Sequence, residues 1–155
     1  MPKIQFWGVR GSCPGGTRNQ ARYGTNTTCI SITIGKTLFI IDSGTGIRLL
    51  SNTLNVKDYD KIVLLITHIH WDHIQGFPFF SYLYQPNVHL SIYHPNVDEI
   101  KHMINQLNGI TFPVEKDQIA ASLSFSSDLS ELSDLCECDA LAVNHPGNCY
   151  GYRFK

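Results

Sequence analysis

The feature that most constrains this sequence is an apolar run that ends in a cluster of histidines. Residues 61–67 (KIVLLIT) form a continuous hydrophobic run, which is typical of a strand buried on both faces of a sheet. The next six residues contain His68, His70, Asp72 and His73. In α/β folds, ligands bind beyond the carboxyl ends of the strands. The sequence therefore predicts an α/β fold with a polar site directly after a buried strand.

The spacing within this cluster favours metal binding. On extended backbone His68 and His70 point to the same side and can bind one cation. Asp72 and His73 follow where the chain turns, so they could hold a second cation or orient a water molecule. Imidazole nitrogen and carboxylate oxygen suit zinc, with manganese or iron as alternatives. The competing interpretation is a loop in which four polar residues are merely hydrogen-bonded.

The composition is that of one folded domain. The chain has 155 residues, of which 43% are hydrophobic and 16% charged, so we expect a single domain over residues 1–155 with a sizeable core. No apolar run approaches the ~18 residues of a membrane span, and the start lacks the apolar stretch of a secretory signal. Five cysteines without a Cys-x-x-Cys pair favour a reducing, cytoplasmic compartment over a disulfide framework.

Hydrophobic periodicity predicts a mixed α/β order of elements. Early strands are joined by a hairpin turn at residues 35–36, and later strands are joined by helical crossovers. Residues 74–84 are expected to form an aromatic-rich helix or loop. The expected strands are 3–9, 29–34, 37–41, 61–67, 88–93, 123–125, 140–144 and 150–154, and the expected helices are 47–54 and 98–107.

The charge is unevenly distributed along the chain. Residues 1–41 carry five basic side chains and no acidic one, so residues 42–155 sum to −6 for a net charge of −1. Arg10, Arg18 and Arg22 flank a long Gly- and Pro-containing loop at residues 11–24. A basic lobe is compatible with an anionic ligand, so these arginines are weak candidates for substrate binding. The alternative is that they are solvated surface charges.

Taken together, these residues resemble the metallo-β-lactamase superfamily of metal-dependent hydrolases, whose signature is His-x-His-x-Asp-His after a strand. The similarity is closest to the phosphodiesterase-like branch, which includes tRNA 3′-processing endonucleases and cyclic-nucleotide phosphodiesterases. The resemblance implies the N-terminal portion of an αββα sandwich, with a mixed sheet and flanking helices. Four further segments support it, namely residues 8–14 (GVRGSCP), 23–29 (YGTNTTC), 42–46 (DSGTG) and 144–147 (NHPG).

The resemblance also implies roles for single residues. His145, which follows an apolar strand, would complete the first metal site formed by His68 and His70. Asp72 and His73 would serve a second metal, and Asp72 would also take a proton from the attacking water.

Two further residues have weaker assignments. Asp42 would support the site from the turn beneath it by fixing a ligand histidine or the loop. The alternative for Asp42 is an aspartate that stabilises a glycine-rich turn. Cys149 could substitute for a missing ligand or could be a small buried strand residue.

The pattern of the superfamily continues beyond the end of this sequence. The later residues of that pattern are an aspartate that bridges the two metals and a last histidine. In this sequence no aspartate follows Asp139 and no histidine follows His145. We therefore expect the C-terminal half of the fold to be absent. The sheet ending at residues 150–154 would lack its partner layer, and a second copy or a completing chain would cover it.

The predicted function is metal-dependent hydrolysis of an anionic phosphodiester, such as a nucleotide or RNA, by a metal-activated water. One alternative is a non-catalytic metal-binding half-domain that pairs with another chain. Another is a hydrolase of the same fold that cleaves thioesters or lactams. Two metal ions per chain would favour the enzyme, and one or none would favour the half-domain.

Overall fold

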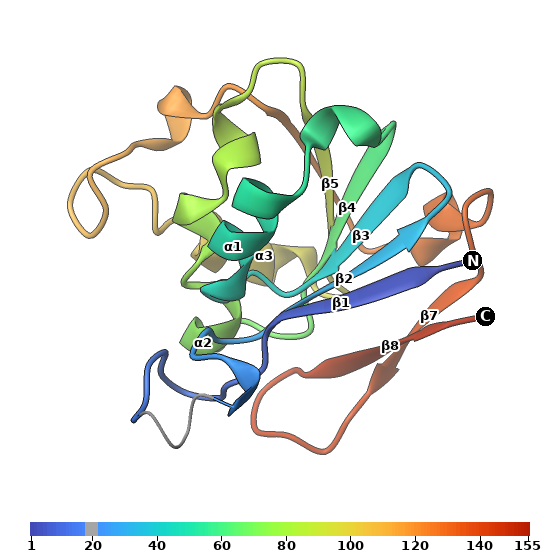
Figure 1. Ribbon diagram of the computed structural model, residues 1–155, viewed down its shortest axis with the longest axis horizontal. Coiled ribbons are helices and arrows are strands. Elements are labelled where there is room, and N and C mark those ends of the chain that lie inside the picture. The colour runs from blue at the N-terminus through green and yellow to red at the C-terminus, as the bar shows by residue number, and fades with distance from the viewer. Residues whose placement is uncertain (18–21) are drawn as a thin grey trace.

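The chain folds around a six-stranded mixed sheet, which a computed structural model describes for residues 1–17 and 22–155 (Figure 1). The strands lie in chain order, with β1, β2 and β3 antiparallel and β3 to β6 parallel. Their bounds are β1 (Lys3–Gly8), β2 (Cys29–Ile34), β3 (Thr37–Ile41), β4 (Lys61–Leu65), β5 (His89–Tyr93) and β6 (Ser122–Ser126). The predicted hairpin at residues 35–36 is confirmed, and Gly35 supplies the left-handed φ of 57° that its turn requires.

Three short helices cover one face of this sheet (Figure 1). They are α1 (Gly46–Thr53), α2 (Trp71–Ile74) and α3 (Val97–Ile104), and α1 and α3 add Ile47, Leu50, Ile100 and Met103 to the core on that face. Residues 74–84 consist mainly of 3₁₀ turns at Phe77–Phe79 and Ser81–Tyr84 rather than one helix. None of the helices in the described ranges is long and apolar enough to cross a membrane.

Helix α3 ends earlier than the predicted 98–107. The N–H groups of Gln106 and Leu107 bond to carbonyls three residues back, which tightens the last turn into a 3₁₀ form.

The central strand β4 is buried on both faces, as predicted. Ile62 and Leu64 pack toward the helices, whereas Val63 and Leu65 face the opposite side. This alternation follows from the two-residue period of a strand. It gives the molecule two cores, one on each side of a single sheet.

The second core is covered by a separate antiparallel hairpin of β7 (Cys138–Ala142) and β8 (Tyr150–Phe154). The ring centroids of Phe154 and Phe39 lie 5.3 Å apart, and the Tyr152 hydroxyl donates to the Ile66 carbonyl at 2.8 Å. Figure 1 shows this hairpin on the side of the sheet opposite the helices.

This placement corrects the expectation for the last strand. Residues 150–154 do not end the main sheet; they supply part of the layer that was expected to be missing. The preceding strand runs over Cys138–Ala142 rather than 140–144, because the chain turns into a loop after Val143, whose N–H bonds across to the Cys149 carbonyl. The hairpin leaves part of β1 uncovered, where Ile4 and Phe6 are 59% and 67% exposed.

Candidate metal centre

The site residues converge from three places in the fold. The turn after β3 carries Asp42, the segment from the end of β4 into α2 carries residues 67–73, and the loop between β7 and β8 carries His145. A hydrogen bond from the Tyr150 N–H to the Thr67 carbonyl, 3.0 Å long, joins the last two places. The parallel strands β3 and β4 both end here, so their polar ends meet at one edge.

Three imidazole rings face one another at this edge. His70 Nδ1 lies 3.0 Å from His68 Nε2 and 3.2 Å from His145 Nε2, and the three nitrogens all lie within 4.8 Å of one another. Zinc–nitrogen bonds of 2.0–2.1 Å at a tetrahedral centre separate two ligands by about 3.3 Å. The donor set and its spacing therefore fit a divalent cation such as zinc.

His68 is the buried member of this trio, and its surroundings keep it neutral. Burial, together with the nearby charges of His73, His70 and His145, lowers the pKa of His68 to about 4. Its Nδ1 faces the Thr67 hydroxyl at 3.0 Å, which leaves Nε2 directed at the other two rings. An uncharged ring with a fixed orientation is the form in which histidine binds metals.

Asp42 lies beneath the cluster and is buried. Its carboxylate accepts from the Thr67 N–H at 2.8 Å and from the Thr67 hydroxyl, and it contacts His73 Nδ1 at 2.7 Å. A carboxylate only accepts, so Nδ1 of His73 carries a proton, and Nε2 has a lone pair for a cation when the ring is neutral. Asp42 thus contacts both His73, a candidate ligand, and the backbone at Thr67, where the histidine motif begins. The φ of Asp42 is 61°, a left-handed value that aspartate tolerates better than most residues.

His73 presents its free nitrogen to Asp72. Nε2 of His73 lies 3.6 Å from Oδ2 of Asp72. Burial by itself would lower the pKa of His73, but the hydrogen bond and charge of Asp42 and the charge of Asp72 outweigh it and raise that pKa. The two groups face each other as a pair that could share a second cation.

The carboxylate of Asp72 is held by the long N-terminal loop. The backbone N–H of Ser12 donates to Asp72 Oδ2 at 2.7 Å. Burial would raise the pKa of Asp72, but the Ser12 N–H and the neighbouring charge of His73 outweigh it and lower that pKa. An ionised, oriented carboxylate beside the three imidazoles can take up a proton.

Of the predicted arginines, the two in the described residues make contacts within the N-terminal loop. Nε of Arg10 donates to the Cys13 carbonyl at 3.5 Å, and the exposed Arg22 lies 5.3 Å from the ring of Tyr23. Arg18 lies outside the described residues. Arg10 and Arg22 thus contact their own loop, the same loop that reaches Asp72 through Ser12.

Some contributors carry no signal of their own in the sequence. Thr67 contacts both oxygens of Asp42 and the ring of His68. In the sequence it is only the last residue of a hydrophobic run, and nothing there predicts these contacts. Ser12 acts through its backbone, at a left-handed φ of 68°. Only their places next to the histidine motif and inside the long loop could have suggested them. Cys149 is half-buried, with a pKa that burial raises, and it stands outside the converging trio.

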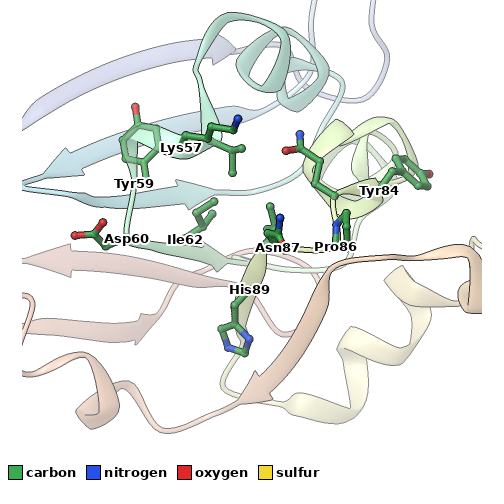
Figure 2. A pocket seen from close by; sticks show the side chains of 11 residues that line it. Lys57, Tyr59, Asp60, Ile62, Tyr84, Pro86, Asn87 and His89 are labelled. Carbon is green, nitrogen blue, oxygen red and sulfur yellow. The ribbon is translucent and has the colours of Figure 1, made fainter.

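Two hollows lie at opposite ends of the parallel strands. Figure 2 shows one of about 350 Å³ near the start of β4 and β5, lined by residues such as Lys57, Tyr59 and His89. The other, also about 350 Å³, borders the candidate centre, with walls formed by His68, Ile69, His70, Glu99, His102 and residues 146–148. The second hollow is therefore the one from which a substrate could reach the histidines.

Comparison with known proteins places the chain in a family. A profile of the Metallo-beta-lactamase superfamily matches residues 22–101, about half of the chain. Ribonuclease BN of Escherichia coli O17:K52:H18 is 31% identical over 168 aligned positions, which cover 99% of this chain and 49% of that protein. Ribonuclease BN of Escherichia coli O1:K1 is 30% identical with the same coverage. The chain thus spans about half the length of the curated relatives it matches.

Solved structures agree at the level of the fold. The metallo-beta-lactamase fold protein YhfI from Bacillus subtilis superposes with a TM-score of 0.65 at 17% identity, over 99% of this chain and 57% of YhfI. A diphosphatase from the PhnP family has the same TM-score at 15% identity, over 99% of this chain and 62% of that protein. The predicted mixed sheet with flanking helices is confirmed. The chain belongs to the metallo-beta-lactamase superfamily.

Proposed function

We propose that this chain is a metal-dependent hydrolase that acts on phosphodiester bonds. The observation that carries the proposal is the convergence of the three ring nitrogens of His68, His70 and His145 on one point, with the Asp72 carboxylate nearby. The phosphodiester part is supported by relatives named ribonuclease BN and by a similar fold in a diphosphatase.

The roles follow from the contacts. His68, His70 and His145 would hold one divalent cation, with zinc as the first candidate and manganese or iron as alternatives. Such a cation lowers the pKa of a water it binds toward neutrality and polarises a phosphoryl oxygen. Asp72, fixed by the Ser12 N–H, accepts the proton of the attacking water.

A second cation would use the other pair of groups. Nε2 of His73 and the carboxylate of Asp72 face each other, and Asp42 holds His73 in that orientation through Nδ1. Two such groups are fewer than the four that a zinc ion usually binds. Either another chain would supply the remaining ligands, or the second site would stay incomplete.

The substrate would be anionic, such as a nucleotide or a stretch of RNA. It would enter the hollow beside His70 and residues 146–148. The basic N-terminal lobe, with Arg10, Arg18 and Arg22, would attract its phosphates through charge-assisted contacts.

Hydrolysis of a chromogenic bis-aryl phosphodiester tests this proposal. The protein loaded with zinc, manganese or iron should turn the ester over, lose activity in a chelator and regain it on addition of metal. The His145→Ala variant should remain inactive under each condition. Activity that survives chelation, or an inactive parent with all three metals, would count against the phosphodiesterase. Parallel assays with a thioester and a lactam distinguish other hydrolases of this fold.

A specific observation favours a second candidate, a metal-binding half-domain that pairs with another chain. Ile4 and Phe6 point from β1 toward the face that β7 and β8 cover only in part. Leaving apolar surface in water costs about 25 cal/mol for each Å². Covering by a second copy would remove this cost.

We expect a homodimer or higher oligomer for this reason. Light scattering after size exclusion should give at least twice the 17.5 kDa of one chain. The double substitution Ile4→Ser and Phe6→Ser should shift the mass toward that of the monomer, whereas Ile110→Ser, at a residue exposed elsewhere, should not. A monodisperse and stable parent monomer would show that the chain needs no partner.

A further inference from the structure

The loop that carries His145 has few attachments of its own. In the described part of the chain its backbone is closed only at the base, where the Val143 N–H donates to the Cys149 carbonyl at 3.0 Å, and residues 144–148 are solvent-exposed. The loop turns at Gly147, whose φ of 83° suits glycine. A segment with so few contacts orders poorly unless a side chain holds it.

One side chain of this loop reaches across to helix α3. Nδ2 of Asn148 donates to Oε1 of Glu99 at 2.6 Å. Glu99 is separated from Asn148 by 49 positions in the sequence, and its side chain is only 16% exposed. A short bond to a charged acceptor that is largely shielded from water is among the stronger hydrogen bonds.

Glu99 has a polar neighbour on each side, and one of them is hydrogen-bonded to it. Nδ2 of Asn96, the residue that caps α3, donates to the same Oε1 at 3.1 Å. On the other side lies the buried His94, whose Nε2 is 4.0 Å from Oε2 of Glu99 and has no hydrogen-bond partner among the described residues. The ring of His94 packs edge-on against Tyr150, 5.5 Å between centroids, where β8 begins. The Asn96 amide therefore orients the Glu99 carboxylate independently of the loop.

We propose that Glu99 is a positioning residue for the third histidine: by binding Asn148 it holds the 144–148 loop so that His145 faces His68 and His70. The inference rests on the proposed metal site and adds the element that assembles it. The same two residues, Glu99 and Asn148, line the hollow beside the centre, so the contact also shapes the entrance for substrate. Preorganised ligands bind a metal more tightly because less ordering accompanies binding.

Metal affinity tests the proposal without any assay of activity. Zinc and cobalt affinities would be measured by competition with a chromogenic chelator for the parent, Glu99→Ala, Asn148→Ala and the double variant. Loss of partners that orient metal ligands costs about 10–100-fold in affinity, so each single variant should bind at least about tenfold more weakly. The double variant should bind metal no more weakly than the weaker-binding single variant, because both substitutions remove the same hydrogen bond.

Two matched variants distinguish loss of the Glu99–Asn148 hydrogen bond from loss of a negative charge and from a general loss of folding stability. Glu99→Gln keeps an oxygen that can accept from Asn148, so it should stay within about twofold of the parent. Asp98→Ala removes a neighbouring carboxylate on the same helix that pairs with Lys101 instead, and it should bind like the parent. Urea unfolding of the metal-free variants shows whether Glu99→Ala alters folding, and Asn148→Ala, on the exposed loop, tests the contact independently.

The outcomes are distinct. Parental affinity in both Glu99→Ala and Asn148→Ala, with His145→Ala strongly weakened, would overturn the positioning role and leave the metal site standing. Parental affinity in His145→Ala would overturn the metal site and this inference with it. Equal weakening by Asp98→Ala would also refute the positioning role, because that residue does not touch the loop.

Discussion

Replacement of Asp72 by alanine is expected to lower phosphodiester turnover by about 10²–10⁴-fold, the usual contribution of a general base. The three imidazoles do not depend on this carboxylate for their own contacts, so the first metal should bind nearly as well as in the parent. Asp72→Asn is the sharper variant, since its amide oxygen can still accept from the Ser12 N–H but can no longer take up a proton.

Steady-state kinetics and metal content, measured on the same preparations, check this expectation. Asp60→Asn serves as the control, because Asp60, just before β4, is exposed and pairs with Lys36 of the turn between β2 and β3. If Asp72→Asn turned over substrate as fast as the parent, Asp72 would have no part in proton transfer. If Asp72→Asn lost both activity and the first metal, Asp72 would be a ligand of that metal.

Removal of a ring from the trio should have a comparably large effect on metal binding. His68→Ala is expected to weaken zinc affinity by more than about 100-fold, because loss of a direct ligand should exceed the 10–100-fold cost of losing an outer partner. His68 is buried, so its removal could also disturb the fold, and His70→Ala at an exposed ring provides the independent variant.

Elemental analysis of protein purified without added metal gives the readout. The control is His89→Ala, since His89 is an exposed histidine at the other end of the strands, where Figure 2 shows its ring. It should retain the metal content of the parent. Unchanged zinc, manganese and iron in both His68→Ala and His70→Ala would remove these residues from the site.

The strands of the main sheet could be predicted from local pattern because burial alternates with the pleat. Ile30, Ile32 and Ile34 alternate with polar residues, and β2 has the predicted bounds. Residues 62–66 are apolar throughout, and β4 is buried on both faces. Periodicity does not say which sheet a strand joins, so the separate β7–β8 hairpin could not be foreseen.

The candidate site also contains residues that local sequence pattern predicts and residues that it does not. His68, His70, Asp72 and His73 are close in sequence, and their spacing alone predicts that they share a site. His145 can be assigned only through the resemblance to a family, since a single histidine after a strand carries no signal. Contacts made by backbone groups or by isolated polar side chains, as at Ser12 and Glu99, depend on packing between distant segments. No local pattern encodes them.

The proposed function depends on three imidazoles of this chain binding one metal ion. X-ray absorption at the zinc edge, on protein loaded with one equivalent of zinc, tests it most directly. We expect scattering from three imidazole rings with zinc–nitrogen distances of about 2.0–2.1 Å and no sulfur neighbour, reduced to two rings in His145→Ala. A sulfur shell at about 2.3 Å, which would implicate Cys149, or a spectrum unchanged by His145→Ala would contradict it.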